Sequence, residues 1–127
     1  MQVSNAAATK TVLIADDDAW MRDMLTALLA DEGFCSIEAR TGPETVQVAD
    51  AHQPDVILLD IALPGRSGFL VLEDLRKRSS TRGIPVLLLS GEINLLDSGH
   101  AHDANAAFHK PLDFSALLAK LHETICG

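Results

Sequence analysis

The sequence predicts an α/β domain in which a parallel β-sheet is covered by helices on both faces. Short apolar runs alternate along the 127-residue chain with segments whose apolar residues recur at helical spacing. Strict alternation of strands and helices favours parallel strands joined by helical crossovers, the doubly wound arrangement. In addition, Asp, Ser and Lys residues follow the apolar runs directly. These features together predict both the fold class and the edge of the sheet that carries function.

Five short runs are the predicted strands. Runs rich in Val, Ile and Leu without alternating polar residues are typical of strands buried on both faces. The runs cover residues 11–15, 55–59 and 84–89, with a weaker run at 106–109 and a further candidate at 34–39. Pro85 lies at the start of its run, where the missing N–H is tolerated.

The segment between the first two strands predicts an amphipathic helix. Its polar residues Arg22, Asp23 and Asp31 are expected on faces away from the core, and Gly33 is a plausible C-terminal stop. Its apolar positions recur at helical spacing and are Trp20, Met21, Met24, Leu25, Leu28 and Leu29.

Three further segments predict helices at 43–52, 68–78 and 113–125. Pro43 lies in a first helical turn and Asp113 is a candidate cap. The segment 91–103 is harder to interpret and accommodates a short helix around 93–96. The predicted order is β-α-β-α-β-α-β-(α)-β-α.

Size and composition indicate one globular domain. We expect a loose N-terminal tail at 1–10 and the domain at 11–127. The net charge of -8 and pI near 4.9 argue against nucleic acid and anionic membranes as partners. Cys35 and Cys126 form no CxxC pattern, which favours reduced thiols in a cytoplasmic protein. No apolar stretch is long enough to span a bilayer, so we expect no membrane span.

Residues with reactive or metal-binding side chains follow four of the predicted strands. Asp16, Asp17 and Asp18 follow the first strand, Asp60 the third, Ser90 the fourth and Lys110 the fifth. Ligands of open parallel sheets bind outside the carboxyl ends of the strands, so these side chains are expected in one crevice. Singly, each has an ordinary structural explanation, and Asp18 in particular is expected to cap a helix.

Together these residue types predict phosphoryl chemistry. Several carboxylates held close together repel one another, and hard oxygen ligands favour Mg²⁺. A carboxylate beside Mg²⁺, a lysine and a hydroxyl is placed to attack a phosphoryl group, because the cations offset charge on the transferring oxygens. Asp60 is the predicted nucleophile, and an aspartyl phosphate is the expected product.

The chain resembles the response-regulator receiver domain of bacterial two-component signalling over residues 11–125. The resemblance rests on the motifs VLIADDD at 12–18, DVILLDIALPGRSG at 55–68, PVLLLS at 85–90 and HKP at 109–111. It implies a five-stranded parallel sheet in the order 2-1-3-4-5, the flavodoxin-like arrangement of CheY-like proteins.

The resemblance also implies a role for each site residue. Asp60 matches the phosphoacceptor, Ser90 the switch hydroxyl and Lys110 the lysine that contacts the phosphoryl group. The expected Mg²⁺ ligands are Asp16, Asp17, Asp60 and the backbone carbonyl of Ala62. The Lys110–Pro111 bond is expected to be cis.

The expected partners follow from the same resemblance. A histidine kinase or a histidine phosphotransfer protein would donate the phosphoryl group. Because no output domain follows residue 125, we expect a stand-alone receiver that signals by binding a target protein or by phosphorelay, as a monomer or a weak phosphorylation-dependent dimer. The expected target-binding face comprises Ile93–Leu96 and Ala107.

One departure from the family pattern concerns the switch. The family usually has Tyr or Phe three residues before its lysine, where this chain has Ala107. The neighbouring Phe108 is expected on the opposite face of the sheet, because side chains alternate along a strand.

Two other hypotheses stay open on the sequence. An Asp-dependent phosphatase would typically carry a second Asp two residues after the nucleophile, where Ala62 stands, so we expect no enzyme activity beyond the domain's own phosphorylation and dephosphorylation. A pseudo-receiver, acting as an interaction scaffold without phosphorylation, is the alternative to the receiver function. The set Asp16, Asp17, Asp60, Ser90 and Lys110 argues against it.

Overall fold

The computed structural model describes residues 9–91 and 103–125. Five parallel strands form one sheet in the order β2-β1-β3-β4-β5. The strands are β1 (Thr11–Ala15), β2 (Cys35–Ala39), β3 (Val56–Asp60), β4 (Val86–Ser90) and β5 (Ala106–His109). The predicted fold class and strand order are therefore confirmed.

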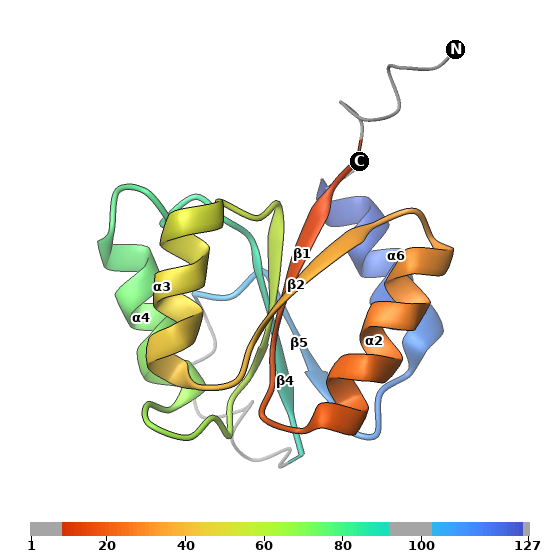
Figure 1. The fold of residues 1–127 in the computed structure, drawn as a ribbon, viewed down its shortest axis with the longest axis horizontal. Coiled ribbons are helices and arrows are strands. Elements are labelled where there is room, and N and C mark those ends of the chain that lie inside the picture. Colours follow the sequence, from red (N-terminus) through yellow and green to blue (C-terminus); the bar gives the residue numbers. More distant parts are fainter. Residues whose placement is uncertain (1–8, 92–102, 126–127) are drawn as a thin grey trace.

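Two layers of helices enclose the sheet (Figure 1). Helices α3 (Gly42–His52) and α4 (Gly68–Lys77) cover one face, and α2 (Ala19–Asp31) and α6 (Phe114–Ile125) cover the other. The four helices agree with the predicted segments to within a residue or two. The short helix predicted around 93–96 lies outside the described residues, as does most of the predicted tail at 1–10.

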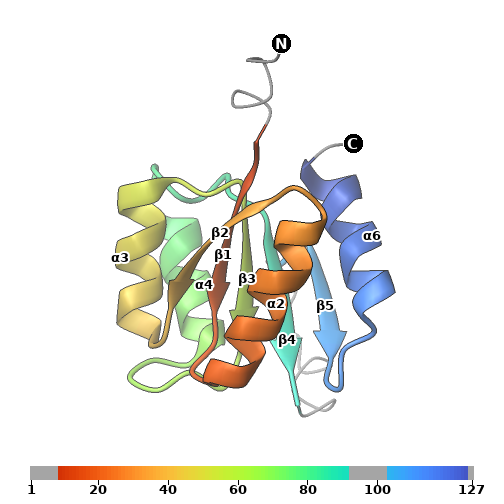
Figure 2. The same cartoon turned by 45° about the vertical axis from the view of Figure 1, so that its right-hand side comes forward.

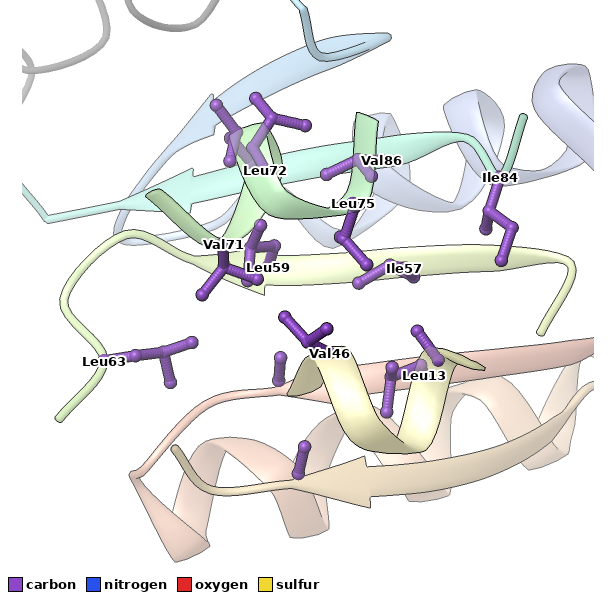
Figure 3. Packing of buried hydrophobic residues seen from close by; sticks show 14 of the residues in the cluster. Leu13, Val46, Ile57, Leu59, Leu63, Val71, Leu72, Leu75, Ile84 and Val86 are labelled. Carbon is purple, nitrogen blue, oxygen red and sulfur yellow. The ribbon is translucent and has the colours of Figure 1, made fainter. Parts of the chain in front are cut away.

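The central strands separate two hydrophobic cores. In β1 and β3, odd-numbered residues such as Leu13 and Ile57 pack under α3 and α4 (Figure 3), and even-numbered residues such as Ile14 and Leu58 pack under α2 and α6. Each of these four side chains is fully buried. Burial on both faces explains why these strands are continuous apolar runs in the sequence.

The two edge strands differ from the prediction of full burial. In β2, Cys35 and Glu38 are exposed, and in β5 Ala107 and His109 are exposed. Both strands lie at the edges of the sheet, where side chains have a neighbouring strand on one side only and are less fully enclosed. Strand composition identified these segments as strands but not as edges.

Helix α2 shows where the helical pattern misassigned residues. Asp18 caps it as predicted, because its carboxylate accepts a hydrogen bond from the N–H of Trp20. Gly33 follows the helix with a φ of 87°. However, Trp20 was predicted in the apolar face and is 62% exposed, whereas Arg22 was predicted on a polar face and is 6% exposed.

All five strands point the same way, so their carboxyl ends meet at one edge of the sheet (Figure 2). The loops that follow β1, β3 and β5 begin at this edge with Asp16, Ile61 and Lys110. Among the described residues, none of the helices combines the length and the apolar character that crossing a bilayer requires.

Candidate functional site

Three carboxylates meet at the carboxyl end of the sheet. Asp16 and Asp17 follow β1 and Asp60 ends β3, and one carboxylate oxygen from each lies within 4.8 Å of the others. We call these three residues the acidic cluster. The sequence predicted this meeting, and the parallel order of β1 and β3 as neighbours brings it about.

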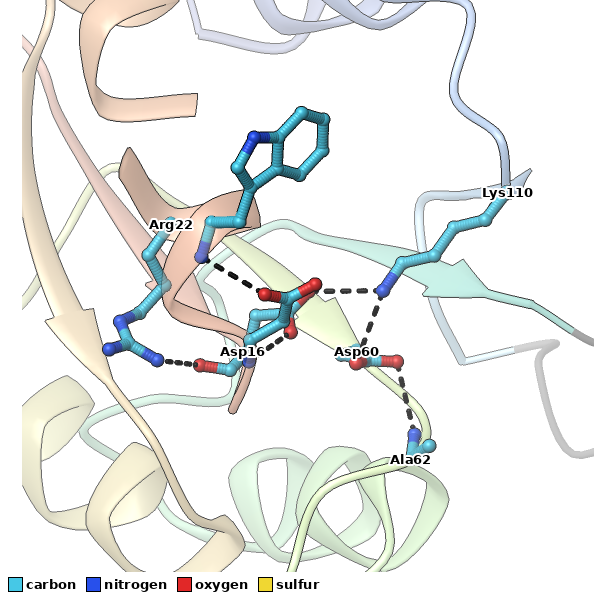
Figure 4. Close-up of polar contacts among 7 residues, drawn as sticks. Asp16, Arg22, Asp60, Ala62 and Lys110 are labelled. Carbon is cyan, nitrogen blue, oxygen red and sulfur yellow. Dashed lines mark hydrogen bonds and ion pairs between the residues drawn. The ribbon is translucent and has the colours of Figure 1, made fainter. Parts of the chain in front are cut away.

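Asp60 is held by two hydrogen bonds. Its Oδ1 accepts from the backbone N–H of Ala62 at 3.1 Å, and its Oδ2 accepts from Lys110 Nζ at 3.3 Å (Figure 4). The residue is 4% exposed. Its carboxylate is therefore fixed in direction before any ligand arrives.

A glycine lets helix α4 begin directly against the backbone of Asp60. The N–H of Gly68 donates to the carbonyl of Ile61 at 2.8 Å. A Cβ at Gly68 would lie 2.5 Å from the carbonyl oxygen of Asp60 and 2.6 Å from the Cα of Ile61. Neither of these backbone atoms can move without moving the candidate nucleophile. The sequence motif contained Gly68, but nothing in its spacing revealed this approach.

Lys110 bridges two members of the acidic cluster. Its Nζ lies 3.1 Å from Oδ2 of Asp16 and 3.3 Å from Oδ2 of Asp60. The N–H of Lys110 extends the sheet beyond β5 by donating to the carbonyl of Ser90 at 2.7 Å. The Lys110–Pro111 bond is cis, as predicted.

Asp16 and Asp17 differ in how firmly they are held. Asp16 is fully buried, and its Oδ1 accepts from the N–H of Asp18 at 2.9 Å while its Oδ2 faces Lys110. Asp17 is exposed. The cluster thus combines two buried, oriented carboxylates with one at the solvent side.

The electrostatics of the site reflect three negative groups around one positive group. Burial raises the pKa of the Asp60 carboxyl above its ordinary value, and the charge of Asp16 raises it further, against the opposing effects of Lys110 and the Ala62 N–H. Burial would lower the pKa of Lys110, but the charges of Asp60 and Asp16 outweigh it and the pKa is raised. The raised pKa of Lys110 and the contribution of Asp16 to that of Asp60 indicate a site with excess negative charge.

We expect Asp60→Asn to stabilise the cation-free protein at neutral pH. A raised folded-state pKa means that ionised Asp60 opposes folding. The destabilisation by ionised Asp60 has its full size above the folded-state pKa and vanishes below the ordinary pKa of aspartate. The change removes the cost of burying a charged carboxylate and its repulsion by Asp16, and it loses the attraction to Lys110, so the net gain is on the order of 1–3 kcal/mol. Urea unfolding with a chelator present, measured at pH 7 and at lower pH values, checks this prediction. The difference in free energy of unfolding between Asp60→Asn and wild type should shrink as the pH falls.

The control for this prediction is Asp55→Asn, at the other end of the same strand. Asp55 accepts a hydrogen bond from the N–H of Thr11 at 2.8 Å, and an asparagine oxygen keeps an acceptor there. This variant should not gain stability. A cation-free Asp60→Asn protein that is less stable than wild type at pH 7 would contradict the electrostatic account.

The donor set of the acidic cluster fits a hard divalent cation. All three side chains offer carboxylate oxygens, and their excess charge is what a dication neutralises. Soft ligands such as thiolates are not part of the cluster, so the chemistry suits Mg²⁺ better than a thiophilic metal. Asp16, Asp17 and Asp60 are therefore the residues that would hold Mg²⁺.

The remaining predicted site residues are placed as follows. Ser90 ends β4 beside β3 and is 2% exposed. Ala62 is exposed and contributes its N–H to Asp60. Ala107 is exposed, and Phe108 is partly buried and packs against the core under α2 and α6, so the predicted opposite orientation of these neighbours is confirmed. Residues Ile93–Leu96 lie outside the described residues.

Sequence reasoning missed the contribution of Arg22 to this site. Its guanidinium donates from Nη1 to the carbonyl oxygen of Asp16 at 2.9 Å (Figure 4). The helical pattern of α2 could not reveal the contact, because the partner belongs to the preceding loop. The sole sequence signal is a basic residue in the first turn of a helix, where the helix dipole disfavours it.

Known proteins resemble this chain over almost its whole length. The family model of the response regulator receiver domain matches residues 12–122. The protein PilH of Pseudomonas aeruginosa is 32% identical over 118 residues, which cover 91% of this chain and 98% of PilH. The transcriptional regulatory protein PdtaR of Mycobacterium tuberculosis is 31% identical over 118 residues, and there the chain spans 56% of the relative's length.

Solved structures agree with these relatives. The response regulator TrrA of Thermotoga maritima, solved in complex with Mg²⁺-BeF, superimposes with a TM-score of 0.85 at 26% identity. The match covers 91% of this chain and 99% of TrrA.

Proposed function

Since this chain belongs to the response regulator receiver domain family, we propose that it is a phosphorylation-controlled switch whose phosphoacceptor is Asp60. The observation that carries the proposal is the setting of the Asp60 carboxylate. It is buried, oriented by the Ala62 N–H and by Lys110, and surrounded by further carboxylates. A nucleophile for phosphoryl transfer needs this combination of fixed direction and neighbouring charge.

In the proposed reaction an Asp60 carboxylate oxygen attacks phosphorus. The new bond joins that oxygen to phosphorus, and the bond from phosphorus to the donor atom breaks on the opposite side. Lys110 already contacts Asp60 and would donate to a phosphoryl oxygen as negative charge shifts there. Ser90, next to β3 at the same edge, would donate its hydroxyl to another phosphoryl oxygen.

Mg²⁺ is the cofactor of the proposal. The ligands would be the carboxylates of Asp16, Asp17 and Asp60 together with the backbone carbonyl of Ala62. When bound, Mg²⁺ supplies positive charge that stabilises the phosphoryl oxygens during transfer. The exposed Asp17 leaves this side of the cluster open to solvent, as a cation that keeps several waters requires.

We further propose that the domain acts through other proteins and not on a separate substrate. A histidine kinase or histidine phosphotransfer protein would supply the phosphoryl group, and a downstream protein would bind the face of Ile93–Leu96 and Ala107. Ala107 is exposed on the edge strand β5, which leaves that part of the face accessible in the described structure. The exposed, unpaired Cys35 is consistent with action in the reducing cytoplasm.

Beryllofluoride, which mimics a phosphoryl group on a carboxylate, tests this proposal. We expect ¹⁹F NMR to detect binding to the wild-type protein when Mg²⁺ is present and none when Mg²⁺ is chelated. Asp60→Asn should abolish binding and Asp17→Asn should weaken it. Asp18→Asn is the matched control, because Asp18 is adjacent but caps α2 instead of joining the acidic cluster. Binding that survives in Asp60→Asn would refute Asp60 as the acceptor.

A further inference from the structure

Arg22 occupies a position that is unfavourable for a cation. It is 6% exposed and lies in the first turn of α2, where the partial positive charge of the helix end opposes a second positive charge. A guanidinium remains charged at every relevant pH, so it cannot escape this cost by losing its proton. Its partners must therefore compensate for burial.

Two acceptors on different elements hold the guanidinium. Nε donates to Oε1 of Glu38 on β2 at 2.8 Å, and Nη1 donates to the backbone carbonyl of Asp16 at 2.9 Å. Glu38 is itself partly exposed, with 42% of its side-chain surface accessible. The pair thus anchors one end of Arg22 to the edge strand and leaves the other end for Asp16.

The contact with Asp16 completes a set of restraints on that residue. Its N–H donates to the carbonyl of Ala39 on β2 at 3.1 Å, and its carbonyl accepts from Arg22. Its two carboxylate oxygens accept from the Asp18 N–H and from Lys110. In Figure 4 the Asp16 carbonyl faces Arg22, while its carboxylate faces Lys110 and Asp60.

From this geometry we propose that Arg22, anchored by Glu38, is a positioning residue that fixes the Asp16 backbone so that its carboxylate is oriented for cation binding. The proposal rests on the proposed Mg²⁺ site and adds a residue to its support. Groups that orient metal ligands without touching the metal typically change affinity by about 10- to 100-fold when removed.

Charge and positioning predict opposite effects on Mg²⁺ affinity. Removing a positive charge beside an acidic cluster should, by Coulomb's law alone, strengthen cation binding. Loss of a positioning contact should weaken it, because Asp16 would have to be ordered when the cation binds. The sign of the change therefore separates the two roles.

The test is a calorimetric Mg²⁺ titration of Arg22→Met, Arg22→Lys and Glu38→Gln beside the wild type. We expect about tenfold weaker binding in Arg22→Met. Arg22→Lys should also bind more weakly although it keeps the charge, because an ammonium cannot reproduce the two-pronged contact. Glu38→Gln, which retains an oxygen acceptor, should change affinity less than either. Glu32→Gln, which alters a hydrogen-bonded contact with His122 at the far end of α2, is the control and should bind as wild type.

Urea unfolding with and without saturating Mg²⁺ provides the second readout. If Arg22 positions Asp16, its replacement reduces the stabilisation that Mg²⁺ adds; a merely structural residue lowers stability equally in both conditions. Unchanged or tighter Mg²⁺ binding in both Arg22 variants would overturn the proposal. If Arg22→Met does not fold, Arg22→Lys decides alone: weaker Mg²⁺ binding supports the proposal, and unchanged or tighter binding overturns it. A wild-type protein without Mg²⁺ binding would instead refute the proposed function.

Discussion

Gly68→Ala is expected to destabilise the protein by about 3 kcal/mol or more. The added methyl group would lie 2.5 Å from the Asp60 carbonyl oxygen and 2.6 Å from the Ile61 Cα, well inside contact distance. Overpacking a core usually costs about 1–3 kcal/mol when side chains can adjust, and here the atoms belong to backbone at the end of a buried strand. Chemical unfolding measures the loss directly.

The effect should reach the site as well as the fold. To relieve the clash, α4 must move away from β3 or the backbone of Asp60 must shift. We therefore expect weaker Mg²⁺ binding in any Gly68→Ala protein that remains folded. Gly91→Ala is the matched control, because a Cβ there would meet no atom of the described residues within 4 Å and the φ of Gly91 is not positive. It should unfold within about 0.5 kcal/mol of wild type. Equal stability of the two variants would contradict the close packing of α4 on Asp60.

Lys110→Met is expected to slow phosphorylation by a small-molecule donor about 100-fold. Loss of one preorganised donor to developing negative charge typically reduces rates by about 10²–10³-fold. The positively charged Nζ of Lys110 lies 3.3 Å from Oδ2 of Asp60. Methionine keeps most of the length and apolar surface of the side chain, so the change removes mainly charge and hydrogen bonding.

The same variant should bind Mg²⁺ more tightly than wild type. Lys110 Nζ contacts oxygens of Asp16 and Asp60 that are proposed cation ligands, so lysine and cation compete for the same negative charge. Slower phosphorylation together with tighter Mg²⁺ binding would separate a direct role of Lys110 from damage to the metal site. The control is Lys120→Met, which removes an exposed ion pair with Glu123 on α6. A Lys110→Met rate within threefold of wild type would contradict the role given to this lysine.

Much of the fold was predictable because the composition of each central strand identifies it as a strand without reference to the rest of the chain. Runs such as 56–59 and 86–89 are apolar throughout, since helices cover both faces of these strands. The alternation of these runs with helical segments then fixes parallel pairing. The edge positions of β2 and β5 were harder to predict. The residue types at Cys35 and Ala107 do not show that these strands have a neighbouring strand on one side only.

The meeting of Asp16, Asp60 and Lys110 was predictable for a related reason. In a parallel sheet, residues that end different strands reach the same edge regardless of their separation in sequence. Asp16 and Lys110 are 94 residues apart, yet their side chains lie 3.1 Å apart. Strand ends thus give long-range information that helices and loops do not.

What could not be predicted depends on tertiary contacts of single residues. A helical pattern treats Arg22 as polar and therefore exposed. In the structure Arg22 is buried because its guanidinium donates hydrogen bonds to Glu38 and to the Asp16 carbonyl. The same pattern counts Trp20 as part of the apolar face, although α2 meets the sheet through Met21, Leu25 and Leu29. Nor does a glycine in a sequence reveal which backbone segment passes close to it. The approach of Gly68 to the backbone of Asp60 is such a contact.

Asp60 is proposed to accept a phosphoryl group in a Mg²⁺-dependent reaction. The most direct measurement is the intact mass of the protein after incubation with a small-molecule phosphodonor, with Mg²⁺ or with chelator. We expect wild type to gain one phosphoryl group with Mg²⁺, and neither the chelated protein nor Asp60→Asn to gain any. A gain in Asp60→Asn, or no gain in a wild-type protein that demonstrably binds Mg²⁺ and beryllofluoride, would contradict the claim; the absence of all three would indicate a scaffold that carries a receiver fold without its chemistry.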